Sequence, residues 1–376
     1  MAPRARSTTE VSTSKGQVRV LTTAHINRVA SVVPPNDVHP AFVRFARTLV
    51  KDERARAVFD RMADKAQISH RFSILRAAPE PDGASVDDGR FYTRDAFPTT
   101  AARMNLFEIH APELASRAVE KLDLSAADKR KISHVIVTSC TGLYAPGIDL
   151  DLIDRCGLDP SVERTMVGFM GCYAAINALK LSRHIVRSDP YAKVLVVNIE
   201  LCTLHMQEVT TLEQMLSFLV FADGAAASIV SADEEGLAMD RFHAELVPET
   251  RHYITWKIRD LGFDMFLSGR VPGAIASGLE ASKHAILDGA EVAAIDHWAV
   301  HPGGRSVLDA VEQGLGLPEK ALAASRDVLD RFGNMSSATV MFVLEQMVAS
   351  ASRGDRGCAM SFGPGLTAET MLFHKV

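Results

Sequence analysis

The sequence predicts an α/β protein made of two related halves that face a single site. One observation is that strand-like and helix-like segments alternate along the chain from Gln17 onward, which is typical of α/β architectures. The other is that similar elements recur in the second half in the same order. At 376 residues, the chain is also long enough for two domains of ordinary size or for one large unit with two cores.

Hydrophobic periodicity predicts the individual elements of the first half. Short apolar runs predict strands at 18–23, 134–138, 193–197 and 225–230. Apolar residues spaced three or four positions apart predict helices at 36–65, at 105–122, at 149–156 and within 168–185. The segment 79–89 combines proline, glycine and aspartate, which favour turns, and is predicted to be a surface loop.

Paired motifs indicate that the second half repeats the first. In each pair, one residue lies at an element of the first half and the other lies at a similar element of the second half. The pairs are His134 with His297, Cys172 with Asn334 and, more loosely, Phe221 with Phe362. The first pair is separated by 163 positions and the second by 162, so the two agree in register to within one residue. We therefore predict halves at 17–232 and 233–376, behind a disordered leader at 1–16. An organellar transit peptide is the alternative for the leader.

Composition and charge exclude several classes of protein. Hydrophobic residues make up 47% and charged residues 23% of the chain, which excludes a disordered chain, a collagen-like fibre and a coiled-coil rod. A protein that binds nucleic acid is expected to have a strongly basic domain, and this chain, with a net charge of −5, does not show one. No apolar run approaches the length of about 18 residues that a membrane helix needs. Five scattered cysteines fit a reducing cytoplasm better than a disulfide scaffold.

Cys172 is the strongest candidate for a nucleophile. It follows the segment Gly168-Phe-Met-Gly171, which allows a tight turn, and it precedes residues with good helix propensity. This pattern predicts a thiol at a helix N-terminus, where backbone N–H groups and the helix dipole favour an anion and lower the pKa of a cysteine. The alternative is that Cys172 is a small buried hydrophobic residue without a chemical role.

His301 and Asn334 complete a candidate catalytic set. His301 follows the apolar strand at 298–300 and precedes Pro-Gly-Gly, so its imidazole is expected to project above the sheet, where it can accept the thiol proton. Asn334 begins the helix that repeats the helix of Cys172, and a pseudo-twofold relation between the halves would aim its amide at the same centre. A plain turn histidine and a helix-capping asparagine are the alternatives.

No motif for a metal or a bound cofactor accompanies these residues. Cys202 with His205, and His134 with Cys140, are too sparse for a zinc site, which needs four ligands at short spacing. The sequence has neither a phosphate-binding loop of the G-x-x-x-x-G-K-[ST] type nor a dinucleotide fingerprint. We therefore expect no metal and no cofactor.

Five short motifs in order resemble the type III polyketide synthases of the chalcone synthase superfamily, over residues 17–376. The motifs are Gly171-Cys172, Phe221-Ala-Asp-Gly224, His301-Pro-Gly-Gly304, Gly333-Asn-Met-Ser-Ser337 and Phe362-Gly-Pro-Gly365. The resemblance implies a thiolase fold with duplicated αβαβα halves in a five-layered arrangement, and a homodimer. It also implies acyl-CoA and malonyl-CoA as substrates, without a carrier protein.

The resemblance implies a role for each residue of the catalytic set. Cys172 carries the acyl chain, His301 and Asn334 stabilise the oxyanions of the thioesters, and Phe221 matches a gate phenylalanine that orients malonyl-CoA for decarboxylation. In the implied mechanism, thiolate Cys172 is paired with protonated His301 and attacks an acyl-CoA starter. The enolate formed by decarboxylation of malonyl-CoA then attacks the Cys172 thioester, and the extended chain cyclises.

The resemblance also implies residues that bind CoA and residues that line the cavity. Arg61 and Lys65 match cations that meet the CoA phosphates, and Val58 replaces a third cation; a solvated helix face is the alternative. Ser306 is a further expected CoA contact. The residues expected to line the substrate cavity are Cys140, Thr141, Ala145, Cys202, His205, Met265 and Ser336.

Departures from the plant enzymes indicate a bacterial branch and argue against chalcone as the product. Met265 and Ala145 stand where the plant enzymes carry a phenylalanine and a methionine, which indicates room for a long acyl chain and an alkylpyrone or alkylresorcinol product. A naphthalene-forming or phloroglucinol-forming activity stays open. The alternatives are a β-ketoacyl-ACP synthase of the initiation type, a cysteine hydrolase, and a catalytically silent binding or scaffold protein.

Overall fold

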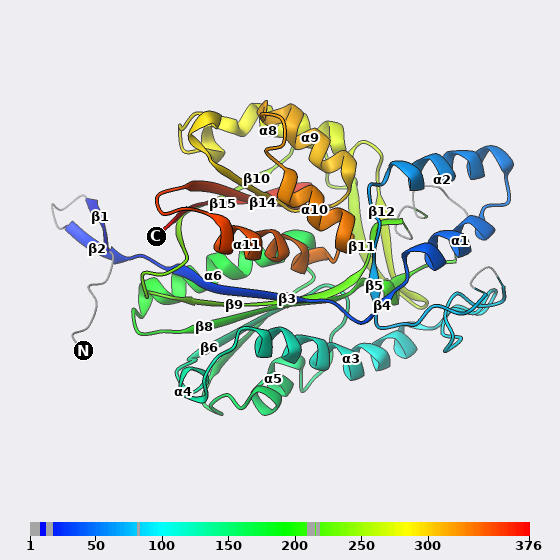
Figure 1. The fold of residues 1–376 in the computed structure, drawn as a ribbon, viewed down its shortest axis with the longest axis horizontal. Helices are drawn as coiled ribbons and strands as arrows, with labels where there is room; N and C mark the ends of the chain where they lie inside the picture. Colours follow the sequence, from blue (N-terminus) through cyan, green and yellow to red (C-terminus); the bar gives the residue numbers. More distant parts are fainter. Residues whose placement is uncertain (1–7, 13–17, 81–82, 209–214, 216–218) are drawn as a thin grey trace.

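The computed structural model describes residues 8–12, 18–80, 83–208, 215 and 219–376. Most of its strands belong to one nine-stranded mixed sheet (Figure 1). The strand order is β13-β14-β15-β10-β3-β9-β8-β6-β7. The strands are β3 (His25–Val32), β6 (His134–Ser139), β7 (Glu163–Gly168), β8 (Val194–Leu201), β9 (Asp223–Ser231), β10 (Leu237–Leu246), β13 (His297–Val300), β14 (Arg356–Gly363) and β15 (Thr367–Lys375).

Two sets of strands in this sheet have the same order and the same directions. From the centre outward, the first set runs β3-β9-β8-β6 and the second runs β10-β15-β14-β13. In both sets the first two pairings are antiparallel and the third is parallel. β7 extends the first set as an edge strand, and β3 and β10 join the two sets. The shared order confirms that the two halves have related folds, whereas the boundary at residue 232 stays a prediction.

Helices lie between the two sets of strands and over their outer faces. α6 (Ala174–Ser188) and α11 (Thr339–Ser350) contact strands of both sets and form the central layer. α3 (Thr100–Lys121) and α5 (Ile148–Cys156) cover the first set, while α8 (Val271–Ile286), α9 (Arg305–Leu315) and α10 (Ala323–Phe332) cover the second (Figure 1). These elements make up the predicted five-layered α/β arrangement.

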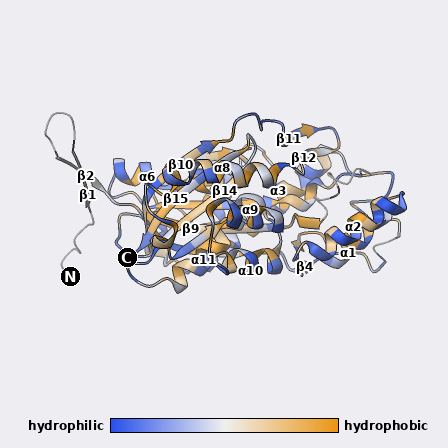
Figure 2. Cartoon of the chain, turned by 90° about the horizontal axis from the view of Figure 1, so that it is seen from above, coloured by the Kyte–Doolittle hydropathy of each residue, from blue (hydrophilic) through white to orange (hydrophobic). Residues whose placement is uncertain are grey.

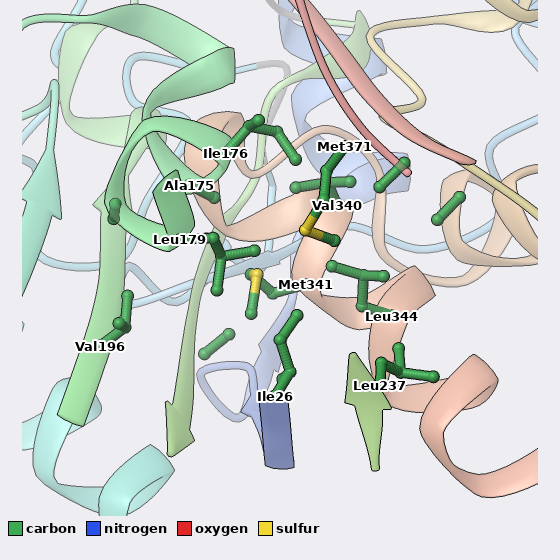
Figure 3. Close-up of a cluster of buried hydrophobic side chains, with 14 of the residues drawn as sticks. Ile26, Ala175, Ile176, Leu179, Val196, Leu237, Val340, Met341, Leu344 and Met371 are labelled. Carbon is green, nitrogen blue, oxygen red and sulfur yellow. The ribbon is translucent and has the colours of Figure 1, made fainter. Parts of the chain in front are cut away.

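Three hydrophobic clusters hold the layers together. The central cluster contains residues of α6, α11 and both sets of strands, and Figure 3 shows side chains that point toward one another: Ile26, Ala175, Ile176, Leu179, Val196, Leu237, Val340, Met341, Leu344 and Met371. The other two clusters lie between each set and its outer helices. Figure 2 shows hydrophobic residues along the central strands and both kinds of residue on α9 and α10. Because burial of a large aliphatic side chain contributes about 1.5–3 kcal/mol, the central cluster fixes the two halves against each other.

Smaller elements lie at the two ends of the sheet. α1 (His39–Leu49) and α2 (Glu53–Lys65) project at one end, where β4 (Asn36–Asp37) pairs with β5 (Phe72–Ser73) and β11 (Ile254–Arg259) pairs with β12 (Gly262–Leu267) (Figure 1). The hairpin of β1 (Thr8–Ser12) and β2 (Val18–Thr22) lies at the other end, and the short helix α4 (Ala126–Lys129) precedes β6. No helix in the described part of the chain is long and apolar enough to cross a membrane.

The structure differs from three of the predicted elements. The helix predicted at 36–65 is two helices, because the chain is extended at Val50 and Asp52, and the Asp52 carboxylate caps α2 by accepting the Ala55 N–H at 2.8 Å. The helix predicted at 105–122 begins at Thr100, with Thr99 as its cap. Within the predicted leader, residues 8–12 form a strand, and the rest of 1–16 lies outside the described residues.

Candidate active site

The predicted catalytic set lines one cavity between the two halves. Cys172 and Phe221 come from the first half, and His301 and Asn334 come from the second. The cavity contains about 1130 Å³ of space not filled by atoms, part of it open to solvent, and most of its exposed lining is apolar. A pocket with an apolar wall and a few polar groups is the usual form of a site for a small organic substrate.

Cys172 lies in the tight turn that precedes α6, as predicted. It is the second residue of a 3₁₀ turn, Gly171–Tyr173, and the first residue of that turn has a φ of 78°. A Cβ at Gly171 would lie 2.5 Å from Cδ of Pro364, so only glycine fits where this turn meets the loop after β14. The turn therefore fixes the thiol at the cavity wall.

The pKa of Cys172 is shifted upward, whereas its place at a helix N-terminus predicts a downward shift. Burial raises the pKa of the Cys172 thiol to about 12, although a hydrogen bond with the Ser336 hydroxyl lowers it. Desolvation disfavours the thiolate more than the start of α6 favours it, because the surrounding wall is apolar. In this state Cys172 is a protonated thiol that needs a base before it can attack.

His301 lies at the same cavity as a neutral imidazole. It directly follows β13, where its backbone N–H donates to the Met360 carbonyl at 2.8 Å, and its side chain is buried. Burial lowers the pKa of His301 to about 3, and neither ring nitrogen has a hydrogen-bond partner among the described residues. A neutral imidazole with a free nitrogen can accept a proton from a thiol and can then donate the new N–H to an oxyanion.

Asn334 is held by the chain around it and does not begin a helix as predicted. The 3₁₀ turn Ser336–Ala338 follows it, and α11 begins only at Thr339. Its Oδ1 accepts the Ser336 N–H at 2.8 Å, and its Nδ2 donates to the Gly303 carbonyl at 3.1 Å. The second hydrogen of the amide remains available, so Asn334 lies at the cavity wall as a neutral donor beside the loop that follows His301.

Phe221 is paired with Asn334 through the backbone. The Asn334 N–H donates to the Val220 carbonyl at 2.8 Å, and the Ala222 N–H donates to the Asn334 carbonyl at 2.9 Å. These two hydrogen bonds form a parallel bridge between a residue of the first half and a residue of the second. The Phe221 ring and the Asn334 amide therefore share one rigid piece of backbone.

Most of the residues predicted for the substrate cavity do line it. These are Cys140, Thr141, Cys202, His205, Met265 and Ser336. Ala145 is exposed on the loop before α5 and does not line the cavity of its own chain, so its place in a substrate cavity stays a prediction that depends on a second copy of the chain. Pro146, Gly147 and the start of α5 carry this loop toward the surface.

Glu200 is a buried carboxylate behind the cavity that sequence reasoning missed. Its oxygens accept hydrogen bonds from the Ser337 hydroxyl at 2.5 Å, the Cys140 N–H at 2.9 Å and the Thr141 hydroxyl at 2.9 Å. Burial raises the pKa of Glu200 to about 7, and the three donors lower it. Glu200 thus ties the turn after β6 to the turn before α11. Its position at the end of a strand rich in apolar residues was the available signal.

An aromatic cluster closes the cavity on the side of the β11–β12 hairpin and was also missed. The ring of His205 stacks on Phe263 at 4.1 Å between centroids, and Trp256 meets both rings edge-on. His205 is fully hydrogen-bonded, because its Nε2–H donates to the Thr141 carbonyl at 2.7 Å and its Nδ1 accepts the Phe263 N–H at 3.0 Å. Burial lowers the pKa of His205 to about 3, which keeps it neutral and makes it a structural clamp.

The residues predicted to bind CoA lie on the surface at the end of the molecule that carries α1 and α2. Arg61 and Lys65 are exposed on α2, and Ser306 is exposed in the first turn of α9. The Arg305 guanidinium donates to the Lys65 carbonyl at 3.4 Å, which brings the end of α2 beside the start of α9. Val307, the residue after Ser306, lines the cavity. The three predicted residues therefore lie beside a wall of the cavity.

No metal centre is found within the described residues, where no three histidine, cysteine, aspartate or glutamate side chains are arranged to hold an ion. Cys202 and His205 both line the cavity, but each ring nitrogen of His205 already has a hydrogen-bond partner. His134 lies in β6 and forms contacts with Ser133 and Glu163 instead of a cysteine. The chemistry available at the site is that of the thiol, the imidazole and the amide.

Comparison with known families identifies the chain. Residues 5–234 match the model of the N-terminal domain of chalcone and stilbene synthases, and residues 238–376 match the model of the C-terminal domain. The chain belongs to this family. It is therefore a type III polyketide synthase, which is an acyltransferase, and not one of the alternatives from other classes.

Relatives of this type III polyketide synthase include bacterial and plant enzymes. The alpha-pyrone synthesis polyketide synthase-like Pks18 of Mycobacterium tuberculosis is 36% identical over 341 residues, which cover 86% of this chain and 84% of that protein. Bisdemethoxycurcumin synthase of Oryza sativa subsp. japonica is 33% identical over 351 residues, which cover 87% and 84%. The two names refer to different products, an alpha-pyrone and bisdemethoxycurcumin, and neither fixes the product of this enzyme.

Solved structures of the same enzyme class share the fold over almost the whole chain. The C-terminal type III polyketide synthase domain of Steely1, a type I/III hybrid from Dictyostelium, has a TM-score of 0.85 at 26% identity and covers 94% of this chain and 99% of its own. PKS-I from the brown alga Ectocarpus siliculosus has a TM-score of 0.81 at 28% identity, covering 94% and 98%. The predicted fold class is thus confirmed.

Proposed function

We propose that this type III polyketide synthase loads a long acyl-CoA starter on Cys172, extends it with malonyl-CoA, and cyclises the product to an alkylpyrone or alkylresorcinol. The observation that carries the proposal is the joint placement of Cys172, His301 and Asn334 at one largely apolar cavity. The similarity to an alpha-pyrone synthesis enzyme supports the pyrone alternative. The cavity supplies the apolar surface that an alkyl chain needs.

Loading begins with proton transfer from the thiol. In the resting site Cys172 is protonated and His301 is neutral, so the imidazole accepts the thiol proton as sulfur attacks the thioester carbonyl of the starter. The resulting ion pair forms as the new C–S bond forms, and the tetrahedral oxyanion takes hydrogen bonds from the Asn334 amide. The C–S bond to CoA then breaks, and the His301 proton goes to the departing CoA thiolate.

Extension uses the same donors on the second substrate. The thioester oxygen of malonyl-CoA is held by His301 and Asn334, and loss of CO2 leaves its electron pair on the α-carbon as an enolate. The enolate carbon attacks the Cys172 thioester, and the cysteine thiolate leaves. Phe221 places an apolar ring beside the malonyl carboxylate, where weak solvation favours the loss of charge as CO2.

CoA thioesters enter from the side of α2 and α9 in this proposal, without a carrier protein. Arg61 and Lys65 offer two exposed cations for the phosphates of CoA, and Ser306 offers a hydroxyl. The chain contributes no bound cofactor or metal to the reaction, and we place the enzyme in the cytoplasm because its five cysteines are free.

We further propose a homodimer that forms along the edge strand β7. Leu143, Met166 and Met170 are exposed apolar residues in this region. The Leu143 side chain lies close to Gly168, which stands between the two methionines in the sequence. Exposed apolar residues gathered on an edge strand are typical of a surface that pairs with a second copy. Light scattering after gel filtration tests this proposal: a monomer at micromolar concentration contradicts it, and charged substitutions at Met166 should dissociate a dimer.

Mass spectrometry of products from a panel of starters tests the proposed reaction. Purified enzyme is incubated with malonyl-CoA and straight-chain acyl-CoA esters of 2 to 18 carbons, and Cys172→Ala is the control. We expect CO2 release and pyrone or resorcinol products that retain the alkyl chain, with the best turnover for long chains. Turnover restricted to short or aromatic starters would contradict the alkyl assignment, and a requirement for an acyl carrier protein would contradict the substrate assignment.

A further inference from the structure

Arg71 is a fully buried arginine at the backbone bridge between Phe221 and Asn334. It follows α2 and directly precedes β5, and none of its side chain reaches solvent. Its Nη1 donates to the Phe221 carbonyl at 2.9 Å, and its Nε donates to Nδ1 of His39 at 2.7 Å. Nη2 has no hydrogen-bond partner among the described residues. The guanidinium thus interacts with the gate residue from outside the cavity.

The same side chain also contacts the Asn334 side of the bridge. A Cβ at Gly333 would lie 2.7 Å from Cγ of Arg71 and 2.9 Å from the Val220 carbonyl oxygen. The stem of Arg71 therefore occupies the space that a side chain at residue 333 would need. Gly333 also has a φ of 70°, a conformation that glycine adopts at little cost. Arg71 touches both segments that form the bridge.

Together these contacts fix the main chain of Phe221 at three consecutive points. Asn334 holds the Val220 carbonyl and the Ala222 N–H, and Arg71 holds the carbonyl of Phe221 itself. With those three groups bonded, the Phe221 ring can change position only by rotation of its own side chain. The same contacts set the position of the Asn334 amide, because its backbone is the partner segment.

Burying the charge of Arg71 costs free energy, and a neutral side chain could make packing contacts at this position without that cost. Burying a guanidinium in an apolar environment is unfavourable unless its charge and its N–H groups are compensated. Asp37 and Asp223 compensate the charge, but the direct acceptors on the guanidinium are a carbonyl and a neutral imidazole. The planar fork of arginine can reach both acceptors at once, which the single ammonium group of lysine cannot do.

We infer that Arg71 is a positioning residue for extension: it acts through Phe221 and Asn334 to set the gate ring and the amide donor relative to Cys172. It does not line the cavity, so it contacts neither substrate nor the reacting atoms. The inference rests on the proposed function, in which Phe221 and Asn334 act on malonyl-CoA. It goes beyond that function by naming the residue that orients both.

Two substitutions at Arg71 and a matched control test the inference. Arg71→Lys keeps the charge but loses the fork, and Arg71→Met keeps the apolar stem without the charge. Arg103→Lys is the control, because Arg103 is equally buried and also has an unpartnered Nη2, but its guanidinium binds the carbonyls of Leu204 and Met206. For each protein, we measure Tm, the rate of Cys172 alkylation by iodoacetamide, and kcat and KM for CO2 release from malonyl-CoA.

We expect Arg71→Lys to lower kcat for CO2 release by about 10- to 100-fold, which is the usual effect of a small misplacement of catalytic groups. KM for malonyl-CoA and the alkylation rate should stay within about twofold of wild type, because neither the CoA-binding surface nor the turn of Cys172 contacts Arg71. Arg71→Met should lower kcat further. Arg103→Lys should lower Tm while the ratio of kcat to alkylation rate changes by less than about twofold.

Arg71→Lys with the kcat of wild type would overturn the inference. The inference would also be overturned by an Arg71 variant in which kcat, KM, the alkylation rate of Cys172 and Tm all change together, because a purely structural role predicts that result. If Arg71→Met does not fold, Arg71→Lys decides. A wild-type enzyme that releases no CO2 from malonyl-CoA overturns the proposed function and this inference with it, whereas release by wild type and unchanged release by Arg71→Lys overturns the inference alone.

Discussion

The backbone of Phe221 in the first half pairs with the backbone of Asn334 in the second half, through two hydrogen bonds of 2.8 and 2.9 Å. This bridge connects the segment that leads into β9 with the segment that leads into the 3₁₀ turn before α11, so the two halves meet at the cavity itself. A displacement of either half therefore moves both the Phe221 ring and the Asn334 amide. We therefore expect activity to depend on the packing between the halves as well as on the side chains proposed to act in catalysis.

Replacing Asn334 should separate its role as a donor from its role in the fold. Asn334→Ala removes the amide N–H from the oxyanion and also the acceptor of the Ser336 N–H. Loss of one oxyanion donor costs about 100- to 1000-fold in rate, so we expect a fall of that size in CO2 release and condensation. Radiolabelled malonyl-CoA measures the release directly.

Asn334→Asp is the control for that experiment. Aspartate keeps an oxygen that accepts the Ser336 N–H, but it cannot donate to an oxyanion. We expect a loss of activity as large as in Asn334→Ala, together with a lower Tm, because the second carboxylate oxygen meets the Gly303 carbonyl to which the amide donates in wild type. Full activity in either variant would show that Asn334 is not an oxyanion donor.

The residues that share the cavity could be predicted from sequence because each is marked by local features. Cys172 and His301 lie beside glycines and at the ends of apolar elements, and the order of such segments along the chain defines the fold. The similarity of the segments that begin at His134 and His297 predicts the duplication, and the matching strand orders confirm it. Local patterns predict elements and their order, and the order alone brings these residues to one edge of the sheet.

The errors concern properties that depend on contacts between distant segments. The helix terminus predicts a lowered pKa for Cys172, but the apolar wall raises it, and that wall is assembled from both halves. The roles of Arg71 and Glu200 depend on partners far along the chain, at Phe221 and Ser337, although the place of Glu200 at the end of an apolar strand marked it as unusual.

The pH dependence of stability should change when Glu200 is replaced by glutamine. Burial raises the pKa of Glu200 from 4.5 to about 7, so the folded state holds this proton more tightly than the unfolded state. The stability gained in this way is present below pH 4.5 and is lost as the pH rises to about 7. Between pH 5 and pH 8, wild type should lose about 2–3 kcal/mol of unfolding free energy that Glu200→Gln does not lose.

Urea unfolding at pH 5 and pH 8 measures this difference. Glu113→Gln removes one carboxylate from the exposed face of α3 and is the matched control for the change in net charge. Parallel pH profiles of wild type and Glu200→Gln would mean that Glu200 binds its proton equally in the folded and unfolded states.

Removing the exposed cations of α2 should weaken the binding of CoA thioesters without affecting the chemistry. We expect the double variant Arg61→Ala/Lys65→Ala to raise KM for malonyl-CoA by about 3- to 30-fold with little change in kcat, because hydrogen bonds between charged groups contribute about 1.5–3 kcal/mol when fully formed and less when exposed. The increase should shrink at 0.5 M salt, where screening is strong. Arg130→Ala, an exposed cation just after α4, is the control, and an equal KM in the two variants would exclude α2 as the CoA-binding surface.

Enlarging the side chain of Met265 should shorten the acyl chains that the enzyme accepts. Met265 lines the cavity on β12, directly opposite Trp256 on β11, so a phenylalanine there fills space that the alkyl chain would use. Each methylene that loses its burial costs about 0.8 kcal/mol, and exclusion of two methylenes therefore lowers kcat/KM by about tenfold or more. We expect Met265→Phe to lose this factor with starters of 12 to 16 carbons and to retain activity with shorter ones.

Phe266→Leu is the matched control for Met265→Phe, because Phe266 is the next residue of the same strand and is exposed on the opposite face of the hairpin. It should leave the preference for chain length unchanged. Product analysis across the starter panel distinguishes the two variants. If Met265→Phe uses long and short starters in the same ratio as wild type, the alkyl chain lies elsewhere in the cavity, and the proposed link between Met265 and chain length is wrong.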